Sequence, residues 1–175
     1  MKSANRLVYI IGFMGSGKST AGRKLAASLK WAFLDLDRKI EEHAGKTIPD
    51  IFRTEGEDGF RKIEAEVLKK TGALKDTVIA AGGGTPCHGD NMDYMLGTGL
   101  TIYLKMTPDQ LTKRLLDSSG ERPLIKDIPD NKLQDFIEEK LADREKWYGR
   151  AKITYEGFSV NISLLNTLVK ENFNI

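Results

Sequence analysis

A glycine-rich segment near the start of the chain has the residue types of a phosphate-binding loop. Residues 12–19 read GFMGSGKS, match the pattern G-x-x-x-x-G-K-[ST] in full and directly follow the apolar run 7–11. In such a loop, backbone N–H groups turn toward nucleotide phosphates and the following helix points its positive end at them. Lys18 reaches the β and γ oxygens and the Ser19 hydroxyl holds Mg²⁺. The expected nucleotide contacts are Gly15, Ser16, Gly17, Lys18, Ser19 and Thr20.

A chance glycine-rich turn is the alternative interpretation of this segment. It is disfavoured because an apolar run precedes the segment and the helix-like run 21–29 follows it.

Two aspartates stand at the end of the second apolar run, in the sequence LDLD. Alternation along a strand predicts that Asp35 and Asp37 point to one side, near the nucleotide phosphates. Two carboxylates there can divide the work: one helps to hold hydrated Mg²⁺, and the other orients a hydroxyl nucleophile and accepts its proton. The alternative is a pair of solvated acids that open the next helix, with Asp37 as its N-cap.

Three consecutive glycines, residues 82–84, follow the third apolar run. Such a triplet costs backbone entropy, so another group must approach this backbone closely or φ must be positive. A plain turn before Thr85 and Pro86 is the alternative. Two arginines on helix-patterned segments, Arg61 and Arg144, are by themselves ordinary surface residues.

The apolar runs and helix-patterned segments alternate along the chain, which predicts an α/β fold with a parallel sheet covered on both faces. Strands are expected at 7–11, 32–36, 77–81, 100–104 and, more weakly, 153–155. Helices are expected at 19–29, 38–44, 57–70, 108–116, 132–148 and 160–171. Ligands of such a sheet bind beyond the carboxyl ends of its strands, where the phosphate loop, both aspartates and the glycine triplet fall.

The length of 175 residues predicts a single domain, 1–175, with two segments that the alternation does not require. Residues 38–70 are expected to form a substrate-binding insertion, and residues 117–130 a lid loop that excludes water from phosphoryl transfer. Plain surface insertions are the alternative for both segments.

Composition and charge argue against a nucleic-acid-binding, membrane or secreted protein. The net charge of +2, from 27 basic and 25 acidic residues, gives no electrostatic footprint for nucleic acid or an anionic membrane. No apolar run approaches the length of a membrane span, and residues 1–6 lack the apolar region of a signal peptide. The single Cys87 has no internal disulfide partner. We therefore expect a cytoplasmic monomer that acts on small molecules.

The order of motifs GFMGSGKST, LDLD, DIFRTEGEDGFRKIE, AAGGGTP and ERPLI resembles that of the shikimate kinase family. The resemblance runs from about residue 6 to residue 148. It implies a P-loop, three-layer α/β/α fold like that of nucleoside monophosphate kinases, with a five-stranded parallel sheet. It also implies phosphoryl transfer from MgATP to the 3-hydroxyl of shikimate, which gives ADP and shikimate 3-phosphate on the route to aromatic amino acids.

The resemblance implies roles for matching positions. Asp37 would contact the shikimate hydroxyls and serve as base, and Asp35 would lie near Mg²⁺. On the acceptor side, Arg61 and Arg144 would clamp the shikimate carboxylate, Glu64 would support Arg61, and Gly82, Gly83 and Gly84 would contact the substrate through their backbone. On the nucleotide side, Arg122 would be the lid arginine on the ATP phosphates. Arg114 would stack on adenine.

Two positions depart from the family pattern. Asn91-Met92 replaces a common Asn-Arg, and residues 155–159 differ from the usual segment at the adenine. Two other functions stay open at this point: a gluconate-type kinase of the same scaffold, and a nucleotide-binding regulatory module without turnover.

Overall fold

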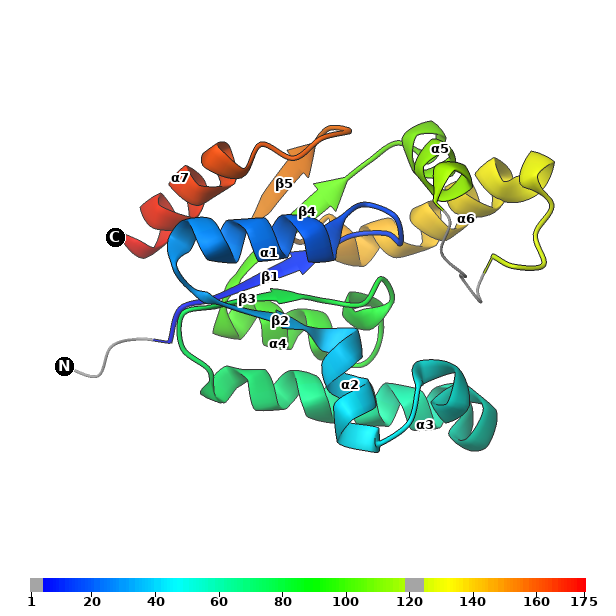
Figure 1. Ribbon diagram of the computed structural model, residues 1–175, viewed down its shortest axis with the longest axis horizontal. Helices are drawn as coiled ribbons and strands as arrows, with labels where there is room; N and C mark the ends of the chain where they lie inside the picture. Colours follow the sequence, from blue (N-terminus) through cyan, green and yellow to red (C-terminus); the bar gives the residue numbers. More distant parts are fainter. Residues whose placement is uncertain (1–4, 119–124) are drawn as a thin grey trace.

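The computed structural model describes residues 5–118 and 125–175, in which a parallel sheet lies between two layers of helices (Figure 1). The sheet has five strands in the order β2-β3-β1-β4-β5, and every pair is parallel. The strands are β1 (Leu7–Ile11), β2 (Ala32–Asp35), β3 (Thr77–Ala80), β4 (Leu100–Lys105) and β5 (Ile153–Glu156). The helices are α1 (Lys18–Leu29), α2 (Leu36–Ala44), α3 (Ile48–Lys70), α4 (Asn91–Thr98), α5 (Pro108–Asp117), α6 (Asp130–Tyr148) and α7 (Ile162–Phe173). The three-layer α/β/α prediction with five parallel strands is therefore confirmed.

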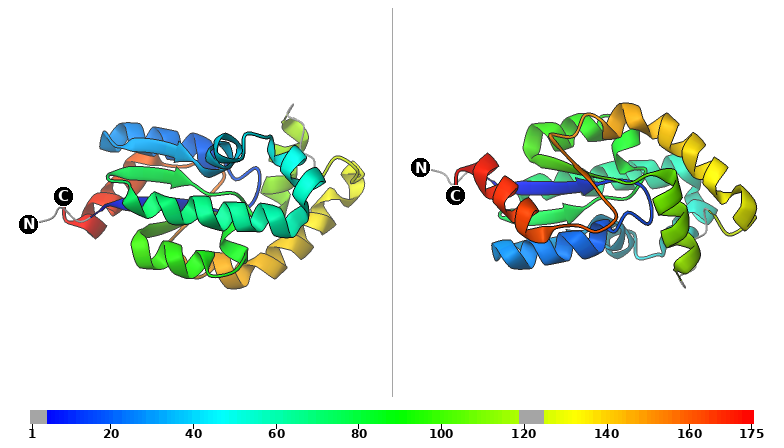
Figure 2. Two further views of the ribbon diagram at one scale, coloured as in Figure 1. Left: turned by 90° about the horizontal axis from the view of Figure 1, so that it is seen from below. Right: turned by 90° about the horizontal axis from the view of Figure 1, so that it is seen from above.

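The central strand β1 is buried along its whole length and divides the core into two layers. Leu7, Tyr9 and Ile11 pack with residues of α2, α3, α4 and α6, while Val8 and Ile10 pack with residues of α1 and α7. Alternating side chains of one strand thus serve opposite faces of the sheet. Figure 2 shows α1 and α7 covering one face, with α3, α4 and α6 on the other.

A third apolar cluster lies beyond the carboxyl ends of the strands, where α5 and α6 pack together. Its fully or nearly buried members are Phe13, Met106, Leu111, Leu115, Leu133 and Ile137. Helix α5 begins with a capping box, in which Thr107 and Gln110 satisfy each other's backbone N–H groups. The cluster joins the phosphate loop, through Phe13, to the two helices that flank residues 119–124.

The structure corrects the expected start of the second helix. Strand β2 ends at Asp35 and α2 begins at Leu36, because the Asp35 carboxylate accepts hydrogen bonds from the N–H groups of Asp37 and Arg38. Asp35, and not Asp37, is therefore the N-cap. Asp37 lies in the first turn of a helix, so strand alternation is the wrong reason for its placement.

Two further differences concern helices. Helix α3 begins at Ile48, nine residues before the expected start, because Thr47 caps it and Pro49 occupies its first turn. The chain kinks within α3 at Gly56, where φ is 71°. Helix α4 was not among the predicted helices, since its eight residues carry little helical periodicity.

Among the residues described, no helix is long and apolar enough to cross a membrane.

The contact between β4 and β1 makes a specific demand on the residue before β4. A Cβ atom on Gly99 would lie 2.6 Å from the carbonyl oxygen of Leu7 and 2.9 Å from Cε2 of Tyr9. We expect Gly99→Ala to lower the free energy of unfolding by about 1–3 kcal/mol, because the backbone of β1 cannot move aside. Thermal unfolding followed by circular dichroism measures this as a loss of several degrees in Tm.

The matched control is Gly97→Ala, two residues earlier in α4. A Cβ on Gly97 meets nothing within 4 Å, so the gain in helix propensity of up to about 1 kcal/mol should leave Tm equal or higher. Equal destabilisation by both substitutions would contradict the close-approach argument.

Candidate active site

The segment between β1 and α1 forms the expected loop at the amino end of a helix. Gly15 and Gly17 have φ values of 82° and 88°, which favour glycine, and Gly17 is the N-cap of α1. No side chain caps α1, and its first turn carries no acid. The free N–H groups and the positive end of the helix dipole are therefore directed to this loop. The Lys18 ammonium donates to the carbonyl oxygen of Phe13 at 3.0 Å.

The hydroxyl of Ser19 lies beside the carboxylate of Asp35. Ser19 Oγ donates to Asp35 Oδ2 at 2.7 Å, so the two predicted metal ligands meet although they come from α1 and the end of β2. Among the residues described, no group of three or more His, Cys, Asp or Glu side chains could enclose a metal. One hydroxyl and one carboxylate fit Mg²⁺, which keeps several waters and takes further oxygens from substrate phosphates.

A cavity of about 350 Å³ collects most of the predicted site residues. It is lined by Met14, Gly15, Gly17, Lys18, Ser19, Thr20, Asp35, Asp37, Ala81, Gly82 and Gly83. Ser16, which is part of the loop, is buried, and its hydroxyl has no hydrogen-bond partner in the described part of the chain. The phosphate loop, both aspartates and two of the three glycines therefore share one cavity.

Asp37 is the acid of this cavity with a perturbed pKa. Asp37 is exposed where it lines the cavity. Partial loss of hydration beside the surrounding protein groups raises the pKa of Asp37 to about 6; the Asp35 carboxylate raises it further, and the Lys18 ammonium opposes the rise. Asp37 is thus a carboxylate whose affinity for a proton is higher than usual, next to a phosphate loop.

The glycine triplet after β3 is approached by three predicted substrate-binding side chains. A Cβ on Gly82 would lie 2.9 Å from Asp37 Oδ1, one on Gly83 would lie 3.4 Å from Arg144 Nη1, and one on Gly84 would lie 2.8 Å from Arg61 Nη2. None of the three has a positive φ. Positive φ is thus ruled out as the reason for the triplet, and close approach holds at Gly82 and Gly84, where a Cβ would displace the ends of the Asp37 and Arg61 side chains.

Arg61 is held by a buried carboxylate. Its Nη1 lies 2.8 Å from Oε2 of Glu64, which is 1% exposed and also accepts a hydrogen bond of 2.6 Å from the Thr85 hydroxyl. Such charge-assisted bonds fix the direction of the guanidinium. Arg61 Nε is buried and finds no acceptor in the described residues. The support of Arg61 by Glu64 that the family resemblance implied is therefore visible.

Arg144 projects from α6 toward the same glycines. Its guanidinium carbon lies 5.2 Å from the centre of the Phe13 ring, and its Nη1 donates to the Tyr148 hydroxyl at 3.4 Å. The ion pairs found among the described residues include none at Arg144. A half-buried guanidinium with aromatic contacts and no carboxylate partner is suited to bind an anionic group.

Arg114 lies on the other side of the phosphate loop, at a separate cavity of about 270 Å³. Its Nη1 donates to the Gly15 carbonyl at 3.4 Å, and its guanidinium carbon lies 4.7 Å from the centre of the exposed Phe158 ring. The position beside the loop fits an adenine contact, and the Phe158 ring already covers one face of the guanidinium. Arg122, the predicted lid arginine, lies outside the described residues.

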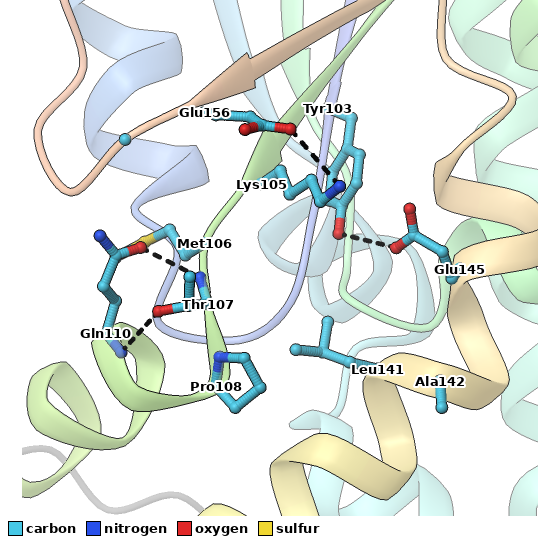
Figure 3. Close-up of a pocket in the computed structure, with 11 residues that line it drawn as sticks. Tyr103, Lys105, Met106, Thr107, Pro108, Gln110, Leu141, Ala142, Glu145 and Glu156 are labelled. Carbon is cyan, nitrogen blue, oxygen red and sulfur yellow. Dashed lines mark hydrogen bonds and ion pairs between the residues drawn. The ribbon is translucent and has the colours of Figure 1, made fainter.

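Sequence reasoning missed three residues of this region: Phe13, Thr85 and Tyr148. No role was assigned to these residues from the sequence, and the signal that could have indicated a contact is the spacing of four between Arg144 and Tyr148 on one helix. A larger cavity of about 510 Å³ opens between α5, α6 and the ends of β4 and β5 (Figure 3). None of the predicted site residues lines it.

Comparison with known proteins agrees with this geometry. Residues 14–159 match the model of the shikimate kinase family. A shikimate kinase of Phocaeicola vulgatus is 42% identical over 145 residues, which is 83% of each chain. The crystal structure of a Bacteroides thetaiotaomicron shikimate kinase superposes with a TM-score of 0.89 at 34% identity, covering 97% of this chain and 99% of the other.

A second solved structure is that of a shikimate kinase from Acinetobacter baumannii in complex with shikimate. It superposes with a TM-score of 0.81 at 32% identity and covers 97% of this chain and 92% of the other. The family match over most of the chain, the identity to curated relatives and the phosphate loop described above lead to one conclusion: this chain belongs to the shikimate kinase family.

Proposed function

We propose that this chain transfers the γ-phosphoryl group of MgATP to the 3-hydroxyl of shikimate, which gives ADP and shikimate 3-phosphate. The observation that carries the proposal is the glycine triplet, where Asp37, Arg144 and Arg61 approach consecutive glycines. An acid and two guanidiniums around one stretch of backbone match a substrate with hydroxyl groups and one carboxylate. The neighbouring phosphate loop supplies the donor site.

Asp37 is the group that acts on the attacking hydroxyl. It faces the cavity that also contains Lys18 and Ser19, so a hydroxyl bound at Asp37 lies near the phosphates of a nucleotide on the loop. The carboxylate orients this hydroxyl in line with the γ-phosphorus and accepts its proton. Since its pKa is raised to about 6, Asp37 is ionised at neutral pH and is a stronger base than an ordinary aspartate.

The cationic groups offset the charge of the transferred phosphoryl. Lys18 and the amino end of α1 act on the phosphate oxygens, and the family resemblance adds Arg122 from the lid. Ser19 and Asp35 would hold Mg²⁺, which supplies further positive charge at the phosphate oxygens when bound. Catalysis then consists mainly of positioning and of charge stabilisation.

The two arginines bind the carboxylate of the acceptor. Arg61 is held by Glu64 and directs its guanidinium to Gly84, the last glycine of the triplet. Arg144 is held against Phe13 and directs its guanidinium to Gly83, the middle one. A guanidinium binds a carboxylate through two parallel N–H bonds, which fixes the orientation of the shikimate ring as well as its position.

We further propose that the protein is a cytoplasmic monomer with ATP and shikimate as its partners, and that it has no role in binding nucleic acid or membranes. Arg114 would contact the adenine.

The two alternatives are less well supported. Gluconate also carries a carboxylate, so the arginines alone do not exclude it, but the curated relatives at about 40% identity are shikimate kinases. A regulatory module without turnover would be expected to lose part of the site, whereas Lys18, Asp37, Arg61 and Arg144 are all present.

The function is tested by coupled ADP release with shikimate, quinate, gluconate or no acceptor, each at saturating MgATP. We expect turnover with shikimate and, for the other three conditions, rates near background. A requirement for gluconate, or equal release without acceptor, would contradict the assignment.

Asp37→Asn should lower kcat with shikimate by about 10²-fold or more. The amide keeps the size of the side chain and still binds a hydroxyl, but it lacks the charge and the proton acceptor. ATP affinity, measured by calorimetry on the same protein, should barely change because the phosphate loop is intact. Near-native turnover, or a parallel loss of ATP binding, would instead make Asp37 a structural or metal-side acid.

The pH profile of the native enzyme should carry the raised pKa of Asp37. As the pH falls through about 6, protonation removes the base, so kcat/KM for shikimate should decline tenfold per unit below that value. This limb should be absent from the residual activity of Asp37→Asn. A profile of the native enzyme that is flat down to pH 5 would contradict a role for Asp37 as base.

Arg61→Lys and Arg144→Lys should each raise KM for shikimate by about tenfold or more, with a much smaller change in KM for ATP. Both changes keep the charge and remove the fork that holds a carboxylate. Arg150→Lys is the matched control, since Arg150 follows the same helix and pairs with Asp93 at the surface. Equal effects on both substrates would mean that the arginines act elsewhere.

A further inference from the structure

Tyr148 connects two parts of the substrate site. It is the last residue of α6 and is fully buried, and its hydroxyl donates a hydrogen bond to the carbonyl oxygen of Gly83. The same hydroxyl accepts a bond from Arg144 Nη1 at 3.4 Å. A phenol hydroxyl can donate one hydrogen bond and can accept at its oxygen. Tyr148 therefore donates to one residue of the site and accepts from another.

The position of the hydroxyl is fixed by the packing of its ring. The Tyr148 ring lies 5.0 Å from that of Tyr103 and belongs to the buried core beneath the sheet. Tyr148 stands one helical turn after Arg144, so the two side chains share a face of α6. Burial raises the pKa of Tyr148 far above its usual value, which keeps the hydroxyl protonated and able to donate.

Arg144 depends on this contact because it has few others. Among the described residues it forms no ion pair, whereas Arg61 is held by the buried carboxylate of Glu64. A further restraint on the Arg144 guanidinium is the face of the Phe13 ring at 5.2 Å, which limits its distance from the ring but not its rotation. The Tyr148 hydroxyl therefore supplies the directional bond that aims the guanidinium at Gly83.

We propose that Tyr148 is a positioning residue for substrate: its hydroxyl ties the Arg144 guanidinium to the Gly83 backbone and so sets where the substrate carboxylate binds relative to the glycine triplet. The inference rests on the proposed function. It assigns to the buried tyrosine an effect on acceptor binding, and none on the nucleotide.

Tyr103 provides a matched control for a purely structural role. It is buried to a similar degree, and its ring packs at a tilt against that of Tyr148. Its hydroxyl, however, donates to Glu145 Oε2 at 3.2 Å (Figure 3) and not to the glycine triplet. Tyr103→Phe and Tyr148→Phe each remove one oxygen from the same ring pair and leave the rings in place. Only the second removes a contact of Arg144.

The experiment compares KM values for shikimate and ATP in the native enzyme and both variants, with thermal unfolding as the check on folding. Tyr148→Phe should raise KM for shikimate by about tenfold, as for loss of a hydrogen bond to a charged group, and should leave KM for ATP within about twofold. Tyr103→Phe should leave both KM values within about twofold. If Tyr148→Phe leaves KM for shikimate unchanged, or raises both values equally, the proposal is overturned.

A double-mutant cycle with Arg144→Lys gives a second readout that general destabilisation would not imitate. If Tyr148 acts through Arg144, adding Tyr148→Phe to Arg144→Lys should raise KM for shikimate by less than about twofold. Effects that multiply would show independent action and overturn the proposal. Native turnover with shikimate is measured first: its absence contradicts the proposed function and this inference together, whereas native turnover with an unchanged Tyr148→Phe contradicts only the inference.

Discussion

The close approach of three side chains to residues 82–84 is the constraint around which this site is built. Asp37 comes from α2, Arg61 from α3 and Arg144 from α6, and each lies where a Cβ atom on the glycine facing it would stand at 3.4 Å or less. A side chain on Gly82 or Gly84 would displace the Asp37 carboxylate or the Arg61 guanidinium, and a Cβ on Gly83 would stand at the limit of ordinary contact with Arg144. Because β3 is completely buried between β2 and β1, the loop that follows it has a fixed position, and the three helices are placed relative to it.

The charged groups of the site favour ligand binding but lower the stability of the folded protein when no ligand is bound. Asp35 and Asp37 lie close enough for the first to raise the pKa of the second, while Lys18 partly compensates. A pKa raised to about 6 means that the ionised Asp37 is less stable in the folded chain than in the unfolded one. This destabilisation is present above pH 6 and is relieved as the pH falls through that value. The carboxylate is thus kept ready for a partner that supplies a proton or a hydrogen bond, as an acceptor hydroxyl does.

Local sequence patterns predicted the parts of the fold that depend on local chemistry. Four of the strands are mainly apolar runs and the phosphate loop is a contiguous motif, so both could be found without knowledge of the fold; β5, which reads ITYE, gave a weaker signal. Boundaries set by single capping side chains were less accessible: Asp35 starts α2 early and Thr47 starts α3 early. Contacts between residues far apart in the chain, such as that of Tyr148 with Gly83 across 65 positions, follow from the packing of α6 on the sheet and have no local signal.

Phe13 explains how the nucleotide loop and the acceptor site keep a constant separation. Its carbonyl oxygen accepts bonds from Ser16 N at 3.1 Å and Lys18 Nζ at 3.0 Å, which ties it to the phosphate loop. Its ring lies under the Arg144 guanidinium and is buried in the cluster formed by α5 and α6. One residue therefore contacts both Lys18 and Arg144, the cations that we propose act on the donor and on the acceptor. Phosphoryl transfer requires the two reacting groups in line and at a short distance. In the proposed reaction Phe13 helps to meet this requirement without touching either substrate, because its carbonyl oxygen holds Lys18 and its ring packs against Arg144.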